Sequence, residues 1–417
     1  MKKYFQMVVK NTIKYEYKQE MSRSTDPGHF FQTDASESIR ARRAAKSGNT
    51  YGHPIVLQSK ILNCVLDPFT SAAIYIAESA GCVRKVNIET RDTTIVYRGP
   101  NAPVTSVAIG GKGGALVFGG CWDKDIWSWN RQSGTPGRRF KGHSDFVKAV
   151  ICVQIGGREL LISGGADKKI IIWDTATGER LHILRDKSDT MMALQDLAID
   201  PEESNDSELI LVSSSSDPHI RRWRISLTSA EQILESVTDT EGQNRTVRST
   251  ISEHETSVYK IRFSGDEGYS DLWTASADGT AKCLSRAKNW NTEETYEHGD
   301  YVRDVVVTGD WVVTTGRDED VKVWDRATGK LWHIYEGHYQ EVTGLLVLKG
   351  EKNVASVSID GTIRTWGLSK PDLEKAKREV AERQKGQVKE EKVQPKEGLL
   401  TAEEEAELAE LMDSDED

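Results

Sequence analysis

Hydrophobic and polar positions alternate in a short, regular rhythm over residues 142–179. The dipeptide Gly142-His143 precedes an apolar run, and three further short runs follow, separated by turn-forming residues. The pattern predicts four strands joined by tight turns. They cover residues 146–155, 160–163, 170–173 and 180–184. Four short strands in about 40 residues are typical of one blade of a β-propeller.

Four side chains in this segment have the types needed for a buried hydrogen-bond chain. They are Asp167 in a turn, His143 in the opening dipeptide, Ser163 on the second strand and Trp173 on the third. On these residues the segment resembles the WD-repeat (β-transducin-like) family, and the resemblance implies that the four are linked. A histidine can accept on one ring nitrogen and donate from the other, so it can join a carboxylate to a hydroxyl. The hydroxyl then accepts the indole N–H, and losing one member leaves the others unpaired.

The same four positions recur along the chain. Two further repeats match at every position, with His298, Thr314, Asp318 and Trp324 in one and His338, Ser356, Asp360 and Trp366 in the other. Three repeats match in part and the first matches at none. The resemblance therefore implies an all-β fold, a seven-bladed WD-repeat propeller over residues 51–369.

The last repeat ends after its third strand, near Gly367, and lacks an outer strand of its own. The apolar segment Ile55–Leu57 is the nearest segment that can supply one. The resemblance implies closure of this kind, and a closed ring protects sheet edges that would otherwise promote aggregation.

The segments outside the repeats are polar and charged. Residues 1–50 are predicted to be a flexible N-terminal extension, and 229–237 a short helix inside an insertion. Residues 370–417 are predicted to be a charged, partly helical tail that ends in a disordered acidic segment. Ser414 precedes three acidic residues, the context of an acid-directed phosphorylation site, with an unmodified disordered end as the alternative.

Composition excludes several classes of function. The net charge of −10 argues against sequence-independent nucleic-acid binding. Arg221, Arg222 and Arg224 flank Trp223, but alternation along a strand favours a solvated edge over a nucleic-acid patch. The 5 cysteines form no CxxC pair, so neither a zinc site nor a disulfide framework is predicted. No apolar run approaches the roughly 18 residues of a membrane span, and no motif indicates a metal or cofactor.

The set Asp167, His143 and Ser163 also has the composition of a nucleophilic triad. An enzyme needs one activated site in a cleft, whereas this set recurs in several repeats. The structural interpretation is therefore favoured, and a hydrolase is the least supported hypothesis.

Partner binding is expected on the top face, because propeller loops form a rigid platform. In the family, contacts concentrate at the residue before each turn aspartate and where each first strand begins. Two groups of candidate partner-binding residues occupy these positions: Trp122 and Phe146, and Tyr301, Arg317, Tyr339 and Ile359. Aromatic residues and arginine are enriched at interface hot spots.

Two hypotheses about function stay open. The first is a non-enzymatic scaffold or adaptor, cytoplasmic or nuclear, that binds proteins or peptides on its top face as a monomer within a larger complex. The alternative is a chaperone or assembly factor that holds a basic client, such as a ribosomal protein or a histone, with its acidic tail.

Overall fold

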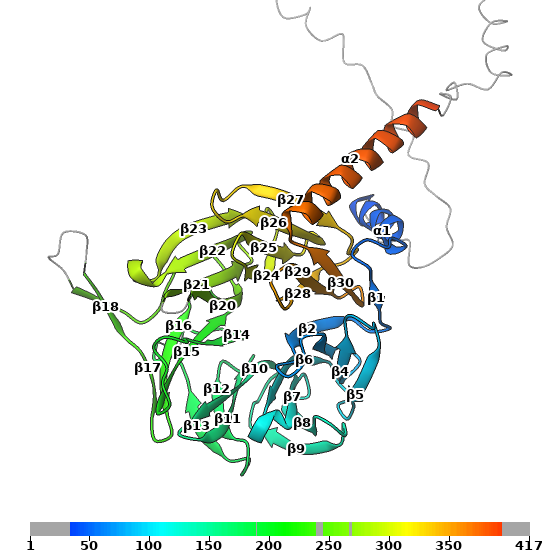
Figure 1. Cartoon of the computed structure of the whole chain (residues 1–417). Helices are drawn as coiled ribbons and strands as arrows, with labels where there is room; N and C mark the ends of the chain where they lie inside the picture. Colours follow the sequence, from blue (N-terminus) through cyan, green and yellow to red (C-terminus); the bar gives the residue numbers. More distant parts are fainter. Residues whose placement is uncertain (1–33, 189, 239–244, 267–268, 394–417) are drawn as a thin grey trace, which may run out of the picture. The chain divides into compact units, whose positions relative to one another are not determined.

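The computed structural model describes residues 34–188, 190–238, 245–266 and 269–393 (Figure 1). The chain divides into two compact units, residues 1–45 and 46–417, and the repeats lie in the second. Helix α1 (Asp34–Ser47) is rich in Arg, Ala and Ser. It falls within the N-terminal extension predicted from the sequence. Neither α1 nor the C-terminal helix α2 (Lys370–Val393) is apolar enough over its described length to cross a bilayer.

Seven antiparallel sheets of four strands each form the ring in Figure 1. The first three blades run in chain order. Blade one holds β2 (Ile61–Leu66), β3 (Ala73–Glu78), β4 (Cys82–Asn87) and β5 (Thr93–Tyr97). Blade two holds β6 (Val104–Gly110), β7 (Leu116–Cys121), β8 (Asp125–Asn130) and β9 (Pro136–Lys141). Blade three holds β10 (Val147–Ile155), β11 (Arg158–Gly165), β12 (Ile170–Asp174) and β13 (Arg180–Leu184).

The next three blades repeat this arrangement. Blade four holds β14 (Leu194–Ile199), β15 (Glu208–Ser215), β16 (Arg221–Ser226) and β17 (Ala230–Gln232). Blade five holds β20 (Val258–Asp266), β21 (Tyr269–Ser276), β22 (Thr280–Ser285) and β23 (Asn291–Glu297). Blade six holds β24 (Val302–Val307), β25 (Trp311–Gly316), β26 (Asp320–Asp325) and β27 (Leu331–Glu336). The hairpin β18 (Glu235–Thr238) and β19 (Arg245–Arg248) lies between blades four and five.

Blade seven joins the two ends of the repeat region. Its strands β28 (Val342–Val347), β29 (Asn353–Ser358) and β30 (Thr362–Gly367) are completed by β1 (Ile55–Val56). Ile55 lies opposite Ile363 in antiparallel register. The predicted seven-bladed fold and its closure by an N-terminal strand are therefore confirmed.

The hydrophobic core lies between neighbouring blades. The third strand of blade three illustrates why, because Ile170, Ile171 and Ile172 are all buried in succession. Such a strand packs on both faces, against the blade before it and the blade after it. Large side chains such as Trp173 and Trp223 fill the same space. Each sheet therefore buries its apolar side chains only by packing against the neighbouring blades.

The predicted helix over 229–237 is wrong. Ala230–Gln232 instead forms β17, the outer strand of blade four, and Glu235 begins β18. Pairing with β16 supplies backbone partners that an isolated short helix lacks, so the tertiary context overrides the local propensity.

The predicted tail begins as a helix that is fixed to the ring. In α2 the side chain of Leu373 is fully buried in a cluster with Trp366 and Tyr335 of blades seven and six. The amine of Lys377 lies 3.8 Å from the ring centre of Trp332. The acidic segment beyond 393, with Ser414, lies outside the described residues.

Candidate interaction surface and central channel

The four predicted side chains of blade three form one continuous chain of hydrogen bonds. His143 Nδ1 lies 2.9 Å from Asp167 Oδ1, and His143 Nε2 lies 2.8 Å from Ser163 Oγ. Trp173 Nε1 donates to the same hydroxyl at 2.9 Å. Asp167 also accepts the amide N–H of Ser144, so the carboxylate holds the loop in which His143 lies.

The same arrangement recurs in blades six and seven. His298 links Asp318 to Thr314, and His338 links Asp360 to Ser356, all at 2.7–2.9 Å. The indoles Trp324 and Trp366 each donate to the hydroxyl of their blade at 2.8 Å. In blade five, His254 connects Asp278 to Thr274 at 2.7 Å. Each hydroxyl is buried, so the sets brace strands and do not line a cleft.

These bonds set the charge states of the turn aspartates. Burial alone would raise the pKa of Asp167, but its bonds to His143 and to the Ser144 amide hold that pKa below its usual range. The pKa of Asp360 is lowered in the same way by His338 and Thr362, against the effect of burial. Burial in turn lowers the pKa of His338. The aspartates are therefore ionised at neutral pH, as hydrogen-bond acceptors should be.

Blade four replaces its missing histidine with a buried arginine. The guanidinium of Arg221 is fully buried, and it bonds Asp217 at 3.1 Å and Asp186 at 3.2 Å. Trp223 Nε1 still donates to Ser213 Oγ at 2.8 Å. Arg222 is also buried and contacts Glu203 at 2.6 Å. The expected solvated edge is therefore wrong for Arg221 and Arg222, whose guanidiniums are held by carboxylates.

Blades one and two use other substitutes. Glu78, fully buried in blade one, forms a two-point ion pair with Arg84. In blade two Gly119 has no hydroxyl, and Trp129 Nε1 donates instead to the carbonyl of Arg98 at 2.8 Å. A β-carbon at Gly119 would lie 3.0 Å from the Trp129 ring, so the indole fills the space of the missing side chain.

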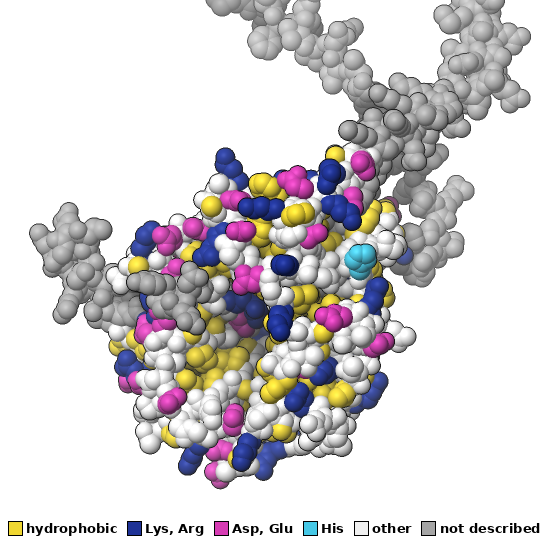
Figure 2. All heavy atoms as spheres, in the orientation of Figure 1, with side chains coloured by type: hydrophobic (Ala, Val, Ile, Leu, Met, Phe, Trp, Pro, Cys, Tyr) yellow, Lys and Arg dark blue, Asp and Glu magenta, His cyan; other side chains and the backbone are white. Residues whose placement is uncertain are grey.

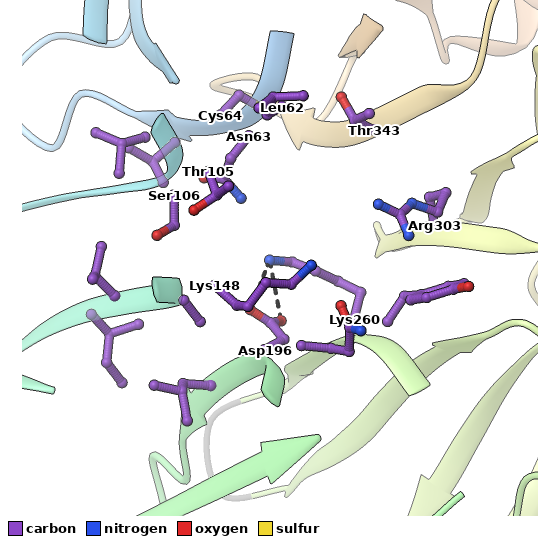
Figure 3. Close-up of a pocket in the computed structure, with 18 of the residues that line it drawn as sticks. Leu62, Asn63, Cys64, Thr105, Ser106, Lys148, Asp196, Lys260, Arg303 and Thr343 are labelled. Carbon is purple, nitrogen blue, oxygen red and sulfur yellow. Dashed lines mark hydrogen bonds and ion pairs between the residues drawn. The ribbon is translucent and has the colours of Figure 1, made fainter. Parts of the chain in front are cut away.

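Every blade begins its first strand with a β-bulge at one residue. The pairing of first and second strands shifts there, which leaves one residue unpaired. We name these residues the bulge ring. They are Leu62, Thr105, Lys148, Gln195, Tyr259, Arg303 and Thr343. All seven line a cavity of about 530 Å³ that the first strands enclose, the central channel (Figure 3).

Ion pairs join the blades around the central channel. Lys260 of blade five contacts Asp196 of blade four at 3.1 Å. Arg262 bonds Asp304 of blade six at 2.8 Å and also donates to the carbonyl of Leu345 in blade seven. Figure 2 shows the ring hollowed at its centre, with basic and acidic side chains at the edge of the hollow.

The first group of candidate partner-binding residues forms a single exposed surface. Trp122 and Phe146 stack with ring centres 5.0 Å apart and planes 15° from parallel. Their exposed fractions are 43% and 39%, although stacking covers one face of each ring. Trp122 also lines the central channel. The structure thus brings the two predicted residues together at a channel mouth.

The second group is more dispersed. Arg317 lies over the ring of Tyr301 at 5.0 Å, and Tyr301 is 42% exposed. Tyr339 is half-buried, and its hydroxyl donates to the carbonyl of Asp360 at 3.0 Å. Ile359 is half-buried and lines the central channel. Tyr301 and Arg317 therefore form a second exposed pair, while Tyr339 also fixes a loop.

Sequence reasoning missed the charged members of the bulge ring, Lys148 and Arg303. Each follows a buried valine that opens a first strand, Val147 or Val302. Arg303 contacts Glu341 at 2.8 Å and lies 4.3 Å from the ring centre of Tyr259. A polar residue directly after the first apolar residue of such a strand was the available signal. Within the described residues no group of His, Cys, Asp and Glu is placed to hold a metal.

Comparison with known proteins supports the repeat assignment. The family model "WD domain, G-beta repeat" matches residues 134–174, 290–325 and 329–367. These ranges end at or next to Trp173, Trp324 and Trp366, the indoles of the three complete sets of four.

Curated relatives match over most of the chain. An uncharacterized WD repeat-containing protein of Schizosaccharomyces pombe is 30% identical over 400 residues, 93% of this chain and 99% of that protein. The nuclear distribution protein nudF of Aspergillus niger is 24% identical over 84% of this chain. The nuclear distribution protein PAC1 of Arthroderma otae is 26% identical over 58% of it. The matches span 65% and 54% of these two longer proteins.

Proposed function

This chain belongs to the WD-repeat family, and we propose that it acts as a non-enzymatic scaffold or adaptor that binds protein partners on its top face. WD-repeat propellers typically mediate protein–protein interactions. The observation that carries the proposal for this chain is the exposed, stacked pair Trp122 and Phe146 at the mouth of the central channel. Rigid aromatic surfaces of this kind are typical anchors of protein interfaces.

The position of the pair supports partner binding. Trp122 follows β7 directly, and Phe146 directly precedes β10, so both rings are held by the ends of strands and not by long loops. The amide of Trp122 donates to the carbonyl of Pro103, and that of Ala166 donates to the carbonyl of Phe146. A binding partner would therefore meet a surface that loses little conformational freedom on association.

The buried sets of four support a non-enzymatic function. Ser163 Oγ has no exposure and already accepts the indole N–H of Trp173. A substrate could not reach this hydroxyl without breaking the blade. The family and its relatives also make a cytoplasmic or nuclear location part of the proposal.

The proposal is tested by affinity purification of the tagged full chain, with partners identified by mass spectrometry. We expect Trp122→Ala to lose most of the stable partners, because truncation of a central aromatic anchor commonly costs about 2 kcal/mol or more. The variant should keep the unfolding temperature of the wild type within a few degrees, because the indole is exposed on one side.

Phe69→Ala is the matched control. Phe69 is 54% exposed and lies in the turn between the first and second strands of blade one, β2 and β3. Trp122 lies in the turn between the second and third strands of blade two, β7 and β8. Turns of these two kinds are on opposite faces of the ring, so Phe69 lies away from the top face. Capture of the same partners by wild type and by both variants would contradict the scaffold proposal for the top face.

The same purification with a chain that ends at Val393 tests whether partner binding depends on the acidic tail. A chain ending at Lys370 would be unsuitable, because it would remove the buried Leu373. Partners that are basic proteins and depend on the tail, but not on Trp122, would support the chaperone hypothesis instead.

A further inference from the structure

Charges in the central channel are paired with one exception. Lys260, Arg262 and Arg303 each contact a carboxylate: Asp196, Asp304 and Glu341 respectively. The fourth cation of the lining is Lys148 of the bulge ring. Across the part of the chain that the structure describes, its amine makes no hydrogen bond and no ion pair. The lining therefore holds one uncompensated positive charge.

An unpaired charge in this place is costly to the free protein. Burial lowers the pKa of Lys148, and the positive charge of Arg303 lowers it further. Both effects mean that the channel without a bound anion disfavours the ammonium form. A bound anion would favour the ammonium form, because it would supply the missing partner and offset the charge of Arg303. Titratable groups whose pKa is shifted in this way are candidates for binding sites.

The position of Lys148 connects it to the exposed aromatic pair. Lys148 lies on β10, two residues after Phe146, which directly precedes that strand. Trp122 stacks on Phe146 and lines the same cavity as Lys148. Figure 3 shows Lys148, Lys260 and Arg303 pointing into the space between the first strands. Trp122 of the exposed aromatic pair and the unpaired cation Lys148 thus line one cavity.

We propose that the central channel receives one acidic side chain of a partner peptide, whose carboxylate binds the amine of Lys148 while a neighbouring apolar residue packs on Trp122 and Phe146. The inference rests on the proposed scaffold function and specifies the chemistry of its partner. One uncompensated cation fits one carboxylate, and a cavity of about 530 Å³ accommodates a side chain with the backbone left at the rim.

The test is selection of random peptides displayed on phage against the immobilised full chain, in parallel with Lys148→Met. Methionine keeps the unbranched stem and removes the charge, so the variant should fold with an unchanged or higher unfolding temperature. We expect the wild type to select peptides with Asp or Glu next to an apolar residue. Lys148→Met should select the apolar residue without the acid.

Binding of one selected peptide then isolates the contact. Replacing its acidic residue by the amide should weaken binding to the wild type roughly tenfold or more, as expected for a charge-assisted hydrogen bond. The same replacement should change binding to Lys148→Met little. Lys112→Met is the matched control, because Lys112 is exposed in a turn between first and second strands. It should behave as the wild type.

Three outcomes would overturn the inference. Equal acidic preference in wild type and Lys148→Met would place the acid elsewhere. Binding of inorganic phosphate that depends on Lys148, without acidic peptides in the selection, would assign the site to a free anion. Apolar peptides that depend on Trp122 but show no acidic preference would remove this inference and leave the scaffold proposal standing.

Discussion

The hydroxyl of Ser163 joins two other side chains of the buried set in blade three. Its hydroxyl meets the imidazole of His143 at 2.8 Å and the indole of Trp173 at 2.9 Å, with no exposure to solvent. If the hydroxyl were removed, His143 Nε2 and the indole N–H of Trp173 would each be buried without a partner, although His143 Nδ1 would still contact Asp167. A buried unsatisfied polar group is more costly than the average hydrogen bond is stabilising.

We therefore predict that Ser163→Ala lowers the free energy of unfolding by about 2–3 kcal/mol, which two unsatisfied groups would produce. Urea unfolding followed by tryptophan fluorescence measures the change. Ser133→Ala is the control, because Ser133 is an exposed turn residue whose hydroxyl contacts only Thr135 and the adjacent backbone. It should change the unfolding free energy by less than about 0.5 kcal/mol. Similar losses in both variants would contradict the structural role of the set.

Asp320 at the start of β26 predicts a pH dependence of stability. Burial, and then the neighbouring charge of Asp318, raise the pKa of Asp320 to about 6. The folded protein thus binds this proton more tightly than the unfolded chain, and the stabilisation from the proton is complete only below the unfolded pKa of about 3.8. It is lost as the pH rises through about 6.

We expect Asp320→Asn to unfold at a higher temperature than the wild type at pH 7.5, because it removes a poorly solvated charge. The advantage should shrink as the pH falls from 6 towards 4, where the wild-type carboxyl becomes neutral. Calorimetry across this range measures it. A constant difference at every pH would show that the carboxyl does not titrate as described.

At the level of single residues, the sequence predicted the buried sets of four but not the charged residues of the central channel, Lys148 and Arg303. The side chains of His143, Ser163, Asp167 and Trp173 have types and spacings that the repeat pattern specifies. The signal for Lys148, a polar residue after the first apolar residue of a strand, is not specific, because a lysine after a valine is common on any strand. Its significance depends on which carboxylates lie across the channel, and those come from blades four, six and seven.

Among the elements, blade four replaces the histidine of the repeat pattern with an ion pair. Its third strand begins with Arg221, whose guanidinium joins Asp217 in the same blade to Asp186, which follows β13 of the preceding blade. Asp186 also accepts hydrogen bonds from the amides of Thr190 and Met191. The ion pair therefore fixes the connection between two blades, as histidine does elsewhere in the ring.

We predict that Arg221→Met destabilises the protein by about 3–5 kcal/mol, because two buried carboxylates lose their cation. Arg224→Met on the same strand is the control, since Arg224 is exposed and its ion pairs lie at the surface. It should cost less than about 1 kcal/mol. Thermal unfolding compares the two, and a small loss for Arg221→Met would mean that water replaces the guanidinium.

The sequence predicted a strand correctly where the local hydrophobic pattern alone favours the conformation that pairing with neighbouring strands requires. The third strand of blade three is apolar throughout and was assigned correctly. Residues 229–237 were assigned to a helix, because nothing local shows that β16 needs an outer partner. The role of Arg221 was missed for a related reason, since its partner Asp186 lies in the connection that precedes the blade.

For the whole molecule the essential feature is closure by β1. Its two residues pair with β30, and the preceding segment adds bonds from Asn49 and Tyr51 to the guanidinium of Arg364. Thr343 Oγ1 donates to the carbonyl of Ile61 at 2.9 Å and so joins blade seven to blade one. The sequence predicted the strand but not these side-chain contacts, because they connect residues from opposite ends of the repeat region.

Deleting residues 1–57 should lower the unfolding temperature and expose the edge of β30, whereas deleting residues 1–33 leaves every described bond of blade seven in place. Hydrogen exchange measures the difference. We expect faster exchange of β30 amides in the longer deletion and unchanged exchange in β12 of blade three. Equal exchange of β30 in both deletions would show that β1 is dispensable.

Closure also imposes an order on synthesis. Ile55 leaves the ribosome about 300 residues before Ile363, its partner across the seam. At translation rates of roughly 5–20 residues per second, the first strand waits about 15–60 s for a place in a sheet. During that time the growing chain is an open arc with an exposed edge at its leading end. Strand β1 is thus synthesised first but pairs last, with β30. The incompletely synthesised chain is therefore the form most prone to misassembly.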